Sequence, residues 1–359
     1  MKKRFTKLGE WLTGERQPTL KQLEAFAKAT HTPFGFLLLK SPPEETLPVP
    51  DFRTVANQEV SRPSPDLLET LHEMQRRQDW MRDYRLDMGA EPLPFIGSES
   101  KQNPPEKVAN SIRATLGLEP QWAREHKNWE DALAAFKEAI QGIGVLVFGS
   151  GIVGSNTHRA LNPEEFRGFV LCDPIAPLIF VNHADAKSAR MFTLAHELVH
   201  LWLGQDALFN LSELQPTTAD VEVFCNRVAA ELLLPAESLM EKWKETRSKH
   251  PFDDLARYFK VSSLVVARRC LDLGLISRAA YQQHYEESIE RFLEFKKKGD
   301  GGNYYDTSRS RLDPNFTFAI RSATRSGELL PTHAQRLVGM KGKTFERFLE
   351  GESMRGGRR

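Results

Sequence analysis

The sequence predicts an α+β fold that is mostly helical, with one small three-stranded sheet in the middle of the chain and helical modules on either side. Apolar residues recur at helical spacing over most of the chain. The period changes between residues 144 and 181, where three short apolar runs are separated by Gly, Pro and Asn, as expected for strands. Two strongly apolar segments with helical spacing follow, at 187–204 and 219–234.

The length and composition place the chain among globular proteins. Its 359 residues are too many for one compact core of ordinary size, so two or three domains are expected. The apolar share of 40% and the charged share of 27% are values that exclude a disordered chain. The net charge of +1 excludes electrostatic nucleic-acid binding by the molecule as a whole, so any such role needs a local patch.

The cysteines and the missing targeting signals favour the cytoplasm. Three cysteines lie far apart and form no CxxC pair, so a reducing compartment is expected and a disulfide framework is not. The basic N-terminus lacks an apolar stretch long enough for a signal peptide. No window of about 18 uninterrupted apolar residues predicts a membrane-spanning helix, so no role at a membrane is expected.

Composition shifts divide the chain into four predicted segments: 1–40, 41–104, 105–286 and 287–359. The first segment reads as helices. The second combines a proline-rich linker with an amphipathic helix over 65–87. The third contains the sheet and ends in a helix-turn-helix-like unit at 252–286, and the fourth is a basic, Gly-rich helical module. Within the third segment the predicted elements follow in order: helices 105–117 and 128–141, strands 144–148, 168–171 and 178–181, then helices 187–204 and 219–234.

The first of the two apolar helices contains an HExxH motif, which is typical of a zinc site. Because positions i and i+4 of an α-helix face the same way, His196 and His200 can meet one Zn²⁺ ion at roughly 2.0–2.1 Å each. Glu197 can act as general base on a water whose pKa the zinc has lowered. The motif therefore predicts one zinc ion per chain and Glu197 as the catalytic residue.

The surroundings of the motif favour a metal over a chance match. The helix is apolar nearly all round, so it is expected to be buried. A buried helix that carries two histidines and a glutamate must satisfy or neutralise them, and a metal ion does so. A pair of hydrogen-bonded core histidines is the alternative.

The third ligand is expected on the next helix, because catalytic zinc usually has three protein ligands and one open position. Glu222 is the first choice, and Asp220 and Glu213 are weaker candidates. Glu231 lies about three turns along the helix, where we expect it to meet solvent. The alternative for Glu222 is an acid that only stabilises the start of the helix. Several small residues near the stripe of Glu222 permit close helix approach: Cys225, Asn226, Ala229 and Ala230.

The two helices together resemble the ImmA/IrrE family of zinc metallopeptidases, a gluzincin-like group. The resemblance rests on RMFTLAHELVH, which ends at His200, and on a later E-x-x-x-N-x-x-A-A-x-L-L-x-P stretch, and it covers about residues 140–285. In that family the first Glu of the second stretch is the third ligand, which implies this role for Glu222. Phe224 replaces a frequent acid and Val199 a frequent Gly, and neither position is a ligand.

The resemblance implies a cytoplasmic zinc endopeptidase that regulates a protein partner by cleaving it. Family members cut helix-turn-helix repressors, and others are encoded beside toxins. The alternative is an antitoxin or regulatory binding protein that sequesters a toxin or a transcription factor, with zinc structural or vestigial. The intact Glu197 favours the enzyme, because binding alone needs no base. His158, His183 and Tyr258 are open candidates for the group that stabilises the oxyanion.

The first segment resembles the second half of an XRE-type helix-turn-helix domain. The resemblance is carried by the stretch from Trp11 to Leu23, LGEWLTGERQPTLKQL in context. It implies that Lys3, Arg4 and Lys7 lie near a recognition helix and contact DNA phosphates. Because the first helices of such a domain find no counterpart, a structural or dimerising role is favoured over DNA binding, and a homodimer is left open.

Two further basic regions are open to the same two interpretations. In the unit at 252–286, Arg268 and Arg269 are among four cations that could contact nucleic acid, but packing against the peptidase core is favoured. The module at 287–359 is expected to bind an acidic partner, nucleic acid or another protein.

Overall fold

The computed structural model describes residues 5–30, 32–41, 63–209, 220–297 and 311–350. Lys3, Arg4 and Glu213 lie outside the described residues, as do most of the proline-rich linker and the Gly-rich stretch before residue 311. The described part is mostly helical with one small sheet, which confirms the predicted α+β class.

The sheet has four strands in the order β1-β3-β2-β4. The central strand β3 pairs in parallel with β1 and antiparallel with β2, and β2 pairs antiparallel with the short β4. The three predicted strands are present, and β4 is an addition that the sequence did not predict. The first strand begins two residues later than expected, because Gly144 turns the chain at φ +93° after the preceding helix. The strand bounds are β1 Leu146–Ser150, β2 Gly168–Leu171, β3 Leu178–Asn182 and β4 Ala207–Phe209.

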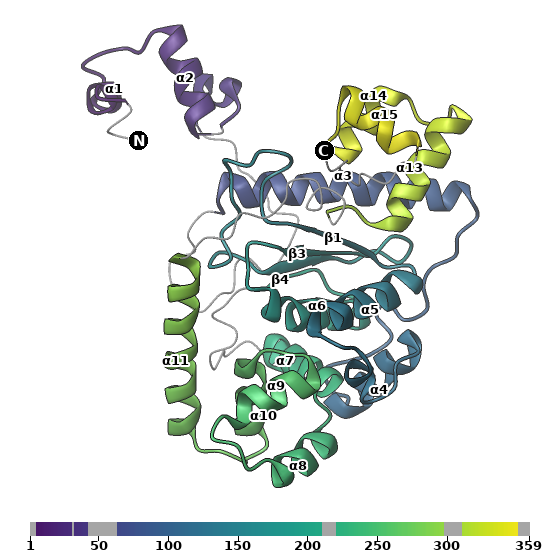
Figure 1. Cartoon of the computed structure of the whole chain (residues 1–359). Helices are drawn as coiled ribbons and strands as arrows, with labels where there is room; N and C mark the ends of the chain where they lie inside the picture. The colour runs from purple at the N-terminus through teal and green to yellow at the C-terminus, as the bar shows by residue number, and fades with distance from the viewer. Residues whose placement is uncertain (1–4, 31, 42–62, 210–219, 298–310, 351–359) are drawn as a thin grey trace, which may run out of the picture.

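Helices cover both faces of this sheet, as Figure 1 shows. On one face lie α5 (Trp129–Gly142) and α6 (Lys187–Leu203), and on the other lies the long α3 (Pro65–Asp87). Alternate strand residues therefore enter different cores. Val147 and Ile179 pack on the α6 side of the sheet, whereas Phe148 and Phe180 pack on the α3 side. This double burial explains why the strands read as continuous apolar runs.

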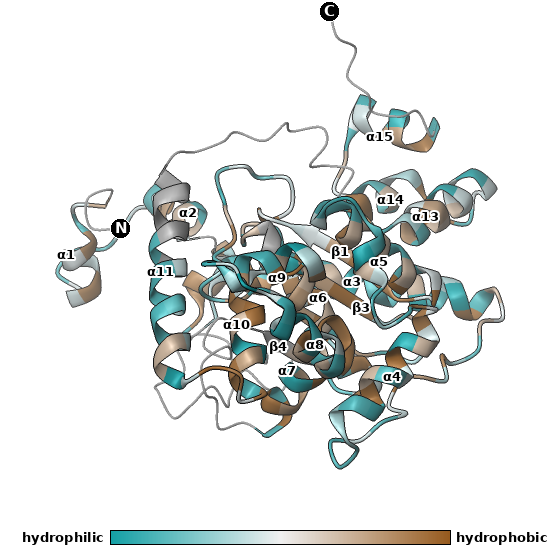
Figure 2. Ribbon diagram, turned by 60° about the horizontal axis from the view of Figure 1, so that its bottom comes forward, coloured by the Kyte–Doolittle hydropathy of each residue, from teal (hydrophilic) through white to brown (hydrophobic). Residues whose placement is uncertain are grey.

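A second helical layer lies beneath α6 and is built around α7, which packs on both α6 and α4. Hydrophobic residues gather in the middle of the molecule, whereas the outer helix α11 carries many hydrophilic residues (Figure 2). Among the described residues, none of the helices combines the length and apolar character needed to cross a membrane. The helices of this part are α4 Pro105–Leu116, α7 Asp220–Leu233, α8 Ala236–Glu245, α9 Pro251–Phe259, α10 Ser263–Asp272 and α11 Arg278–Lys297.

The expectation that Glu231 meets solvent is wrong. Its side chain is buried and forms an ion pair with Arg269 of α10, which is equally buried. Arg113 of α4 also donates to the Glu231 backbone carbonyl at 2.8 Å. A charge at this depth needs a partner, and the partner comes from far along the chain. Arg269 therefore fastens α10 to α7 and is not available to nucleic acid.

The C-terminal helices cover α3 and the outer face of the sheet. They are α13 (Pro314–Ser326), α14 (Pro331–Val338) and α15 (Gly342–Glu350), and Phe316 and Ile320 of α13 are fully buried in the core of that side. Arg77 of α3 donates to the Leu337 carbonyl at 2.8 Å and pairs with Glu73 at 2.5 Å. The division of the chain into four segments stays a prediction, but these helices share a core with the sheet.

Asp313 joins the C-terminal helices to β1. Its Oδ2 accepts from the backbone N–H of Val147 at 3.0 Å and from Gln141 at 2.7 Å. Its Oδ1 caps the start of α13, accepting from the N–H groups of Asn315 and Phe316 at 2.8 and 3.0 Å. The residue is fully buried, and its bonds to the N–H groups of Val147 and Phe316 are buried with it.

We expect Asp313→Ala to lower the free energy of unfolding by about 2–4 kcal/mol, because it removes a helix cap and leaves the Val147 N–H buried without its acceptor. Asn128→Ala is the matched control, since Asn128 caps the start of α5 and its side-chain hydrogen bonds go to the exposed Asp131 of the same helix. It should cost about 1 kcal/mol. Urea unfolding measures both free energies of unfolding. Equal losses in the two variants would contradict a stabilising link between Asp313 and β1.

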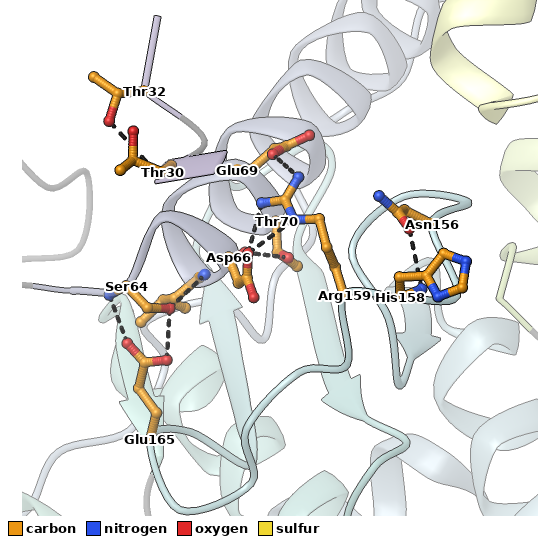
Figure 3. A network of polar contacts seen from close by, with 11 residues as sticks. Thr30, Thr32, Ser64, Asp66, Glu69, Thr70, Asn156, His158, Arg159 and Glu165 are labelled. Atoms are coloured by element: carbon orange, nitrogen blue, oxygen red, sulfur yellow. Dashed lines mark hydrogen bonds and ion pairs between the residues drawn. The ribbon is translucent and has the colours of Figure 1, made fainter. Parts of the chain in front are cut away.

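The loop between β1 and β2 is held against the first turns of α3 (Figure 3). Arg159 of this loop pairs with Asp66 at 2.6 Å and with Glu69 at 2.5 Å. Glu165 accepts from both the N–H and the hydroxyl of Ser64 at 2.7 Å. The loop is thus fixed at two points, Arg159 and Glu165, to the start of the helix that lies on the opposite face of the sheet from α6.

The N-terminal segment folds into α1 (Leu8–Thr13), α2 (Leu20–Thr30) and a short 3-10 helix, Phe34–Leu38. Phe26 of α2 lies edge-on to Trp11 and to Phe5, which gives this unit a small aromatic core. Lys7 immediately precedes α1 and is partly buried. The predicted helices are present, whereas DNA contact by Lys3, Arg4 and Lys7 stays a prediction.

Candidate metal centre

The helix α6 is buried over its whole motif-bearing part. His196, Glu197 and His200 have exposed fractions of 0%, as do Leu198 and Val199 between them. The helix ends at Gly204, which adopts a left-handed φ of +67° and lies against Gly97 of another loop. The prediction of a buried helix that carries three polar side chains is confirmed.

Glu222 of α7 lies against both histidines. Its Oε2 is 3.0 Å from Nε2 of His196, and its Oε1 is 3.6 Å from Nε2 of His200. The two Nε2 atoms are 3.1 Å apart. One atom from each of the three residues lies within 4.8 Å of the others. Of the described acids considered for the third position, Glu222 comes to the histidines, Asp220 is exposed and Glu231 pairs with Arg269.

The charges of this cluster suit metal binding. Burial lowers the pKa of His196 and outweighs the opposing effect of Glu222, so the imidazole is neutral. Burial alone would raise the pKa of Glu222, but hydrogen bonds and charge interactions with His196 and His200 outweigh it and hold that pKa well below its usual range. A neutral imidazole and an ionised carboxylate are the forms that bind metal. Two imidazole nitrogens and one carboxylate oxygen fit a catalytic zinc ion.

The outer nitrogens of both histidines face α7. Nδ1 of His196 lies 3.1 Å from Oδ1 of Asn226, and Nδ1 of His200 lies 3.8 Å from Sγ of Cys225. The sequence placed both residues near the stripe of Glu222 but did not predict these contacts. The usable signal was their spacing, three and four residues after the third candidate ligand.

Glu197 follows His196 on α6, and its carboxylate lies where β2 passes close to the helix. A Cβ atom at Gly168 would be 3.0 Å from Oε1 of Glu197, 2.8 Å from Cγ2 of Thr193 and 2.9 Å from the Phe180 carbonyl oxygen. Only glycine fits there without displacing a neighbour. Gly168 therefore lies in close contact with Glu197. The sequence indicated only that Gly168 begins a strand and did not predict this contact.

We expect Gly168→Ala to lower the free energy of unfolding by about 1–3 kcal/mol, because the added methyl overpacks the contact between β2 and α6. The matched control is Gly142→Ala, since a Cβ at Gly142 of α5 meets nothing within 4 Å. That change should be neutral or slightly stabilising in a helix. Thermal unfolding compares the two, and a melting temperature of Gly168→Ala at or above that of the control would rule out the close contact.

The structure does not bring the three oxyanion candidates into the His196–His200–Glu222 cluster. His158 is exposed on the loop held by α3 (Figure 3). The Tyr258 hydroxyl lies 3.2 Å from Arg124 and 3.4 Å from Gln121. His183 lies at the end of β3, with its ring over Gly149 of β1. All three stay without support for that role.

The stability of the protein should depend on His183 between pH 7 and pH 4. Burial first, and then the charges of Arg190, Lys137 and Arg311, lower the pKa of His183 to about 3. The unfolded chain, with a histidine pKa of roughly 6.5, binds a proton that the folded state refuses, so stability is lost as the pH falls below that value. The loss approaches about 1.4 kcal/mol per pH unit.

We expect His183→Gln to flatten this slope, and His158→Gln to leave it unchanged because His158 is exposed. Urea unfolding at several pH values gives the slope directly. A slope for His183→Gln that equals the wild-type slope would contradict a neutral His183 in the folded state.

Comparison with known proteins finds similarity to metallopeptidases in the part of the chain that contains these residues. Residues 142–271 match the IrrE N-terminal-like domain, Peptidase_M78, and residues 312–351 match a domain of unknown function, DUF8813. The radiation response metalloprotease IrrE of Deinococcus deserti is 33% identical over 124 residues, which are 30% of this chain and 42% of that protein. The chain thus matches less than half the length of this relative. The chain is thus similar in part to IrrE-type metalloproteases, with the matched peptidase domain at residues 142–271.

Proposed function

We propose that this chain is a cytoplasmic zinc-dependent endopeptidase that regulates a protein partner by cleaving it. The observation that carries the proposal is the convergence of His196, His200 and Glu222 from two neighbouring helices, with the buried Glu197 next to His196 in the sequence of α6. The match of residues 142–271 to the IrrE N-terminal-like peptidase domain supports it.

In this proposal His196 and His200 hold one zinc ion through Nε2, and Glu222 holds it through its carboxylate. The spacing of the three side chains supports these roles, as do the lowered pKa values of His196 and Glu222. Bound zinc supplies Lewis-acid polarisation of the scissile carbonyl and of the attacking water. With three protein ligands, one coordination position is left for the reaction.

Glu197 is proposed as the general base. Its carboxylate takes a proton from the attacking water as the new C–O bond forms at the peptide carbon. It then passes that proton to the amide nitrogen, which leaves as an amine when the C–N bond breaks. The full burial of Glu197 keeps the carboxylate in a medium of low dielectric, where a charge acts strongly on its neighbours.

The identity of the partner rests on the resemblance alone. A helix-turn-helix repressor is the first candidate and a toxin or antitoxin the second. DNA contact through Lys3, Arg4 and Lys7, and a homodimer, are kept as secondary expectations. The rival function is a binding protein that holds its partner without cutting it.

The test compares wild type with Glu197→Gln. Each zinc-loaded protein is incubated with a cell extract from its source, and newly formed peptide N-termini are identified by mass spectrometry. A small set of N-termini that appears with wild type and not with Glu197→Gln supports the endopeptidase. If the two proteins give the same N-termini while both form a stable complex with a partner, the binding protein is the better account.

A further inference from the structure

The helix α7 contacts both histidines of the proposed zinc site on their outer sides. Glu222, Cys225 and Asn226 follow one another at spacings of three and one, within little more than one helical turn. Glu222 faces the Nε2 atoms, Asn226 faces Nδ1 of His196, and Cys225 faces Nδ1 of His200. One short stretch of helix thus surrounds the pair of imidazoles.

The geometry decides which ring nitrogen carries the proton. The Nε2 atoms are 3.1 Å apart and both lie against the Glu222 carboxylate, so their lone pairs are the ones that a metal ion would use. A neutral imidazole that binds metal through Nε2 carries its proton on Nδ1. Because both rings have exposed fractions of 0%, that N–H group needs an acceptor inside the protein.

The two histidines meet different acceptors. The amide oxygen of Asn226 lies 3.1 Å from Nδ1 of His196, a normal hydrogen-bond distance. The sulfur of Cys225 lies 3.8 Å from Nδ1 of His200, which is within reach of a longer and weaker bond to sulfur. Cys225 itself is fully buried, so solvent does not compete for the contact.

We propose that Cys225 is the positioning residue for His200, accepting the Nδ1–H group on sulfur and thereby fixing the rotation and the tautomer of the ring. This inference rests on the proposed zinc site. It assigns to a thiol the task that a carboxylate, a carbonyl or an amide usually performs behind a metal-bound histidine. Loss of the acceptor leaves a buried N–H group unsatisfied and the ring less well oriented.

The test measures zinc affinity by competition with a chelator, so it needs no substrate. Cys225→Ser and Cys225→Ala have nearly equal volumes, but only serine keeps an acceptor. We expect zinc affinity to fall about 10-fold in Cys225→Ala, at the low end for outer partners, and less than about 3-fold in Cys225→Ser. The matched control is Cys270→Ala, because Cys270 is equally buried in the same core but lies on α10.

A second readout follows the ring itself. In zinc-loaded protein labelled with ¹⁵N-histidine, the Nδ1–H resonance of His200 should shift in Cys225→Ser and exchange rapidly in Cys225→Ala, while that of His196 stays unchanged. If the alanine variant fails to fold, Cys225→Val supplies an apolar side chain without an acceptor.

The outcomes separate the two proposals. Wild type that binds no zinc overturns the proposed function and this inference together. Wild type that binds zinc, with equal losses of affinity in Cys225→Ser and Cys225→Ala, means that Cys225 only fills space and overturns this inference alone. Zinc affinity that is retained in Cys225→Ser, lost in Cys225→Ala and unchanged in Cys270→Ala supports the inference.

Discussion

Glu197→Gln is expected to abolish cleavage and to leave zinc binding intact. Removal of a general base typically costs about 10²–10⁴ in rate. The amide has nearly the shape of the carboxylate, so it should fit between α6 and Gly168, where space for a larger group is lacking. The variant keeps all three candidate ligands, His196, His200 and Glu222.

The measurement pairs cleavage with elemental analysis. Wild type and Glu197→Gln should contain equal zinc, about one ion per chain, while the N-termini produced from the partner disappear in the variant. Undiminished cleavage by Glu197→Gln would exclude the proposed base. A variant that has lost its zinc as well would show that the change disturbed the site, and Glu197→Asp then tests the role of the carboxylate separately.

Glu222→Ala is expected to empty the metal site. Loss of a direct ligand should exceed the 10–100-fold fall in affinity that outer partners cause, so we expect a fall of about 100-fold or more. The change also leaves the Nε2 atoms of His196 and His200 3.1 Å apart without the carboxylate that α7 brings to them.

Asp220→Ala is the matched control for this prediction. Asp220 lies on the first turn of α7 like Glu222, carries the same charge and is exposed. It should retain the wild-type zinc content, measured by elemental mass spectrometry on protein purified without a metal-affinity tag. Equal zinc in wild type and Glu222→Ala would mean that a different group completes the site.

Much of this architecture was readable from local patterns. The helix predicted over 65–87 begins and ends where α3 does, because Ser64, Pro65 and the apolar spacing specify its start. The HExxH motif predicted the buried face of α6, and the need for a third ligand singled out Glu222. These inferences concern residues within one or two helical turns of each other or within one recognisable motif.

The misses all involve contacts between distant parts of the chain. β4 has three residues, too few for a period to be visible. Glu231 looked solvated because Arg269, the partner that permits its burial, is 38 residues away. Gly168 and Cys225 gained their importance from the packing of β2 and α7 against α6, which no local pattern records.

The burial of both faces of the sheet has a consequence for what counts as one unit of this protein. The match to the peptidase family ends at residue 271, yet Phe148, Phe169 and Phe180 of its strands point to the side covered by α3 and α13. A fragment cut to the family's limits would turn this row of aromatic rings toward water, which favours association between copies. The segment that carries the proposed chemistry is therefore shorter than the segment that stays in solution without associating. The strands need α3 and α13 to cover their second face.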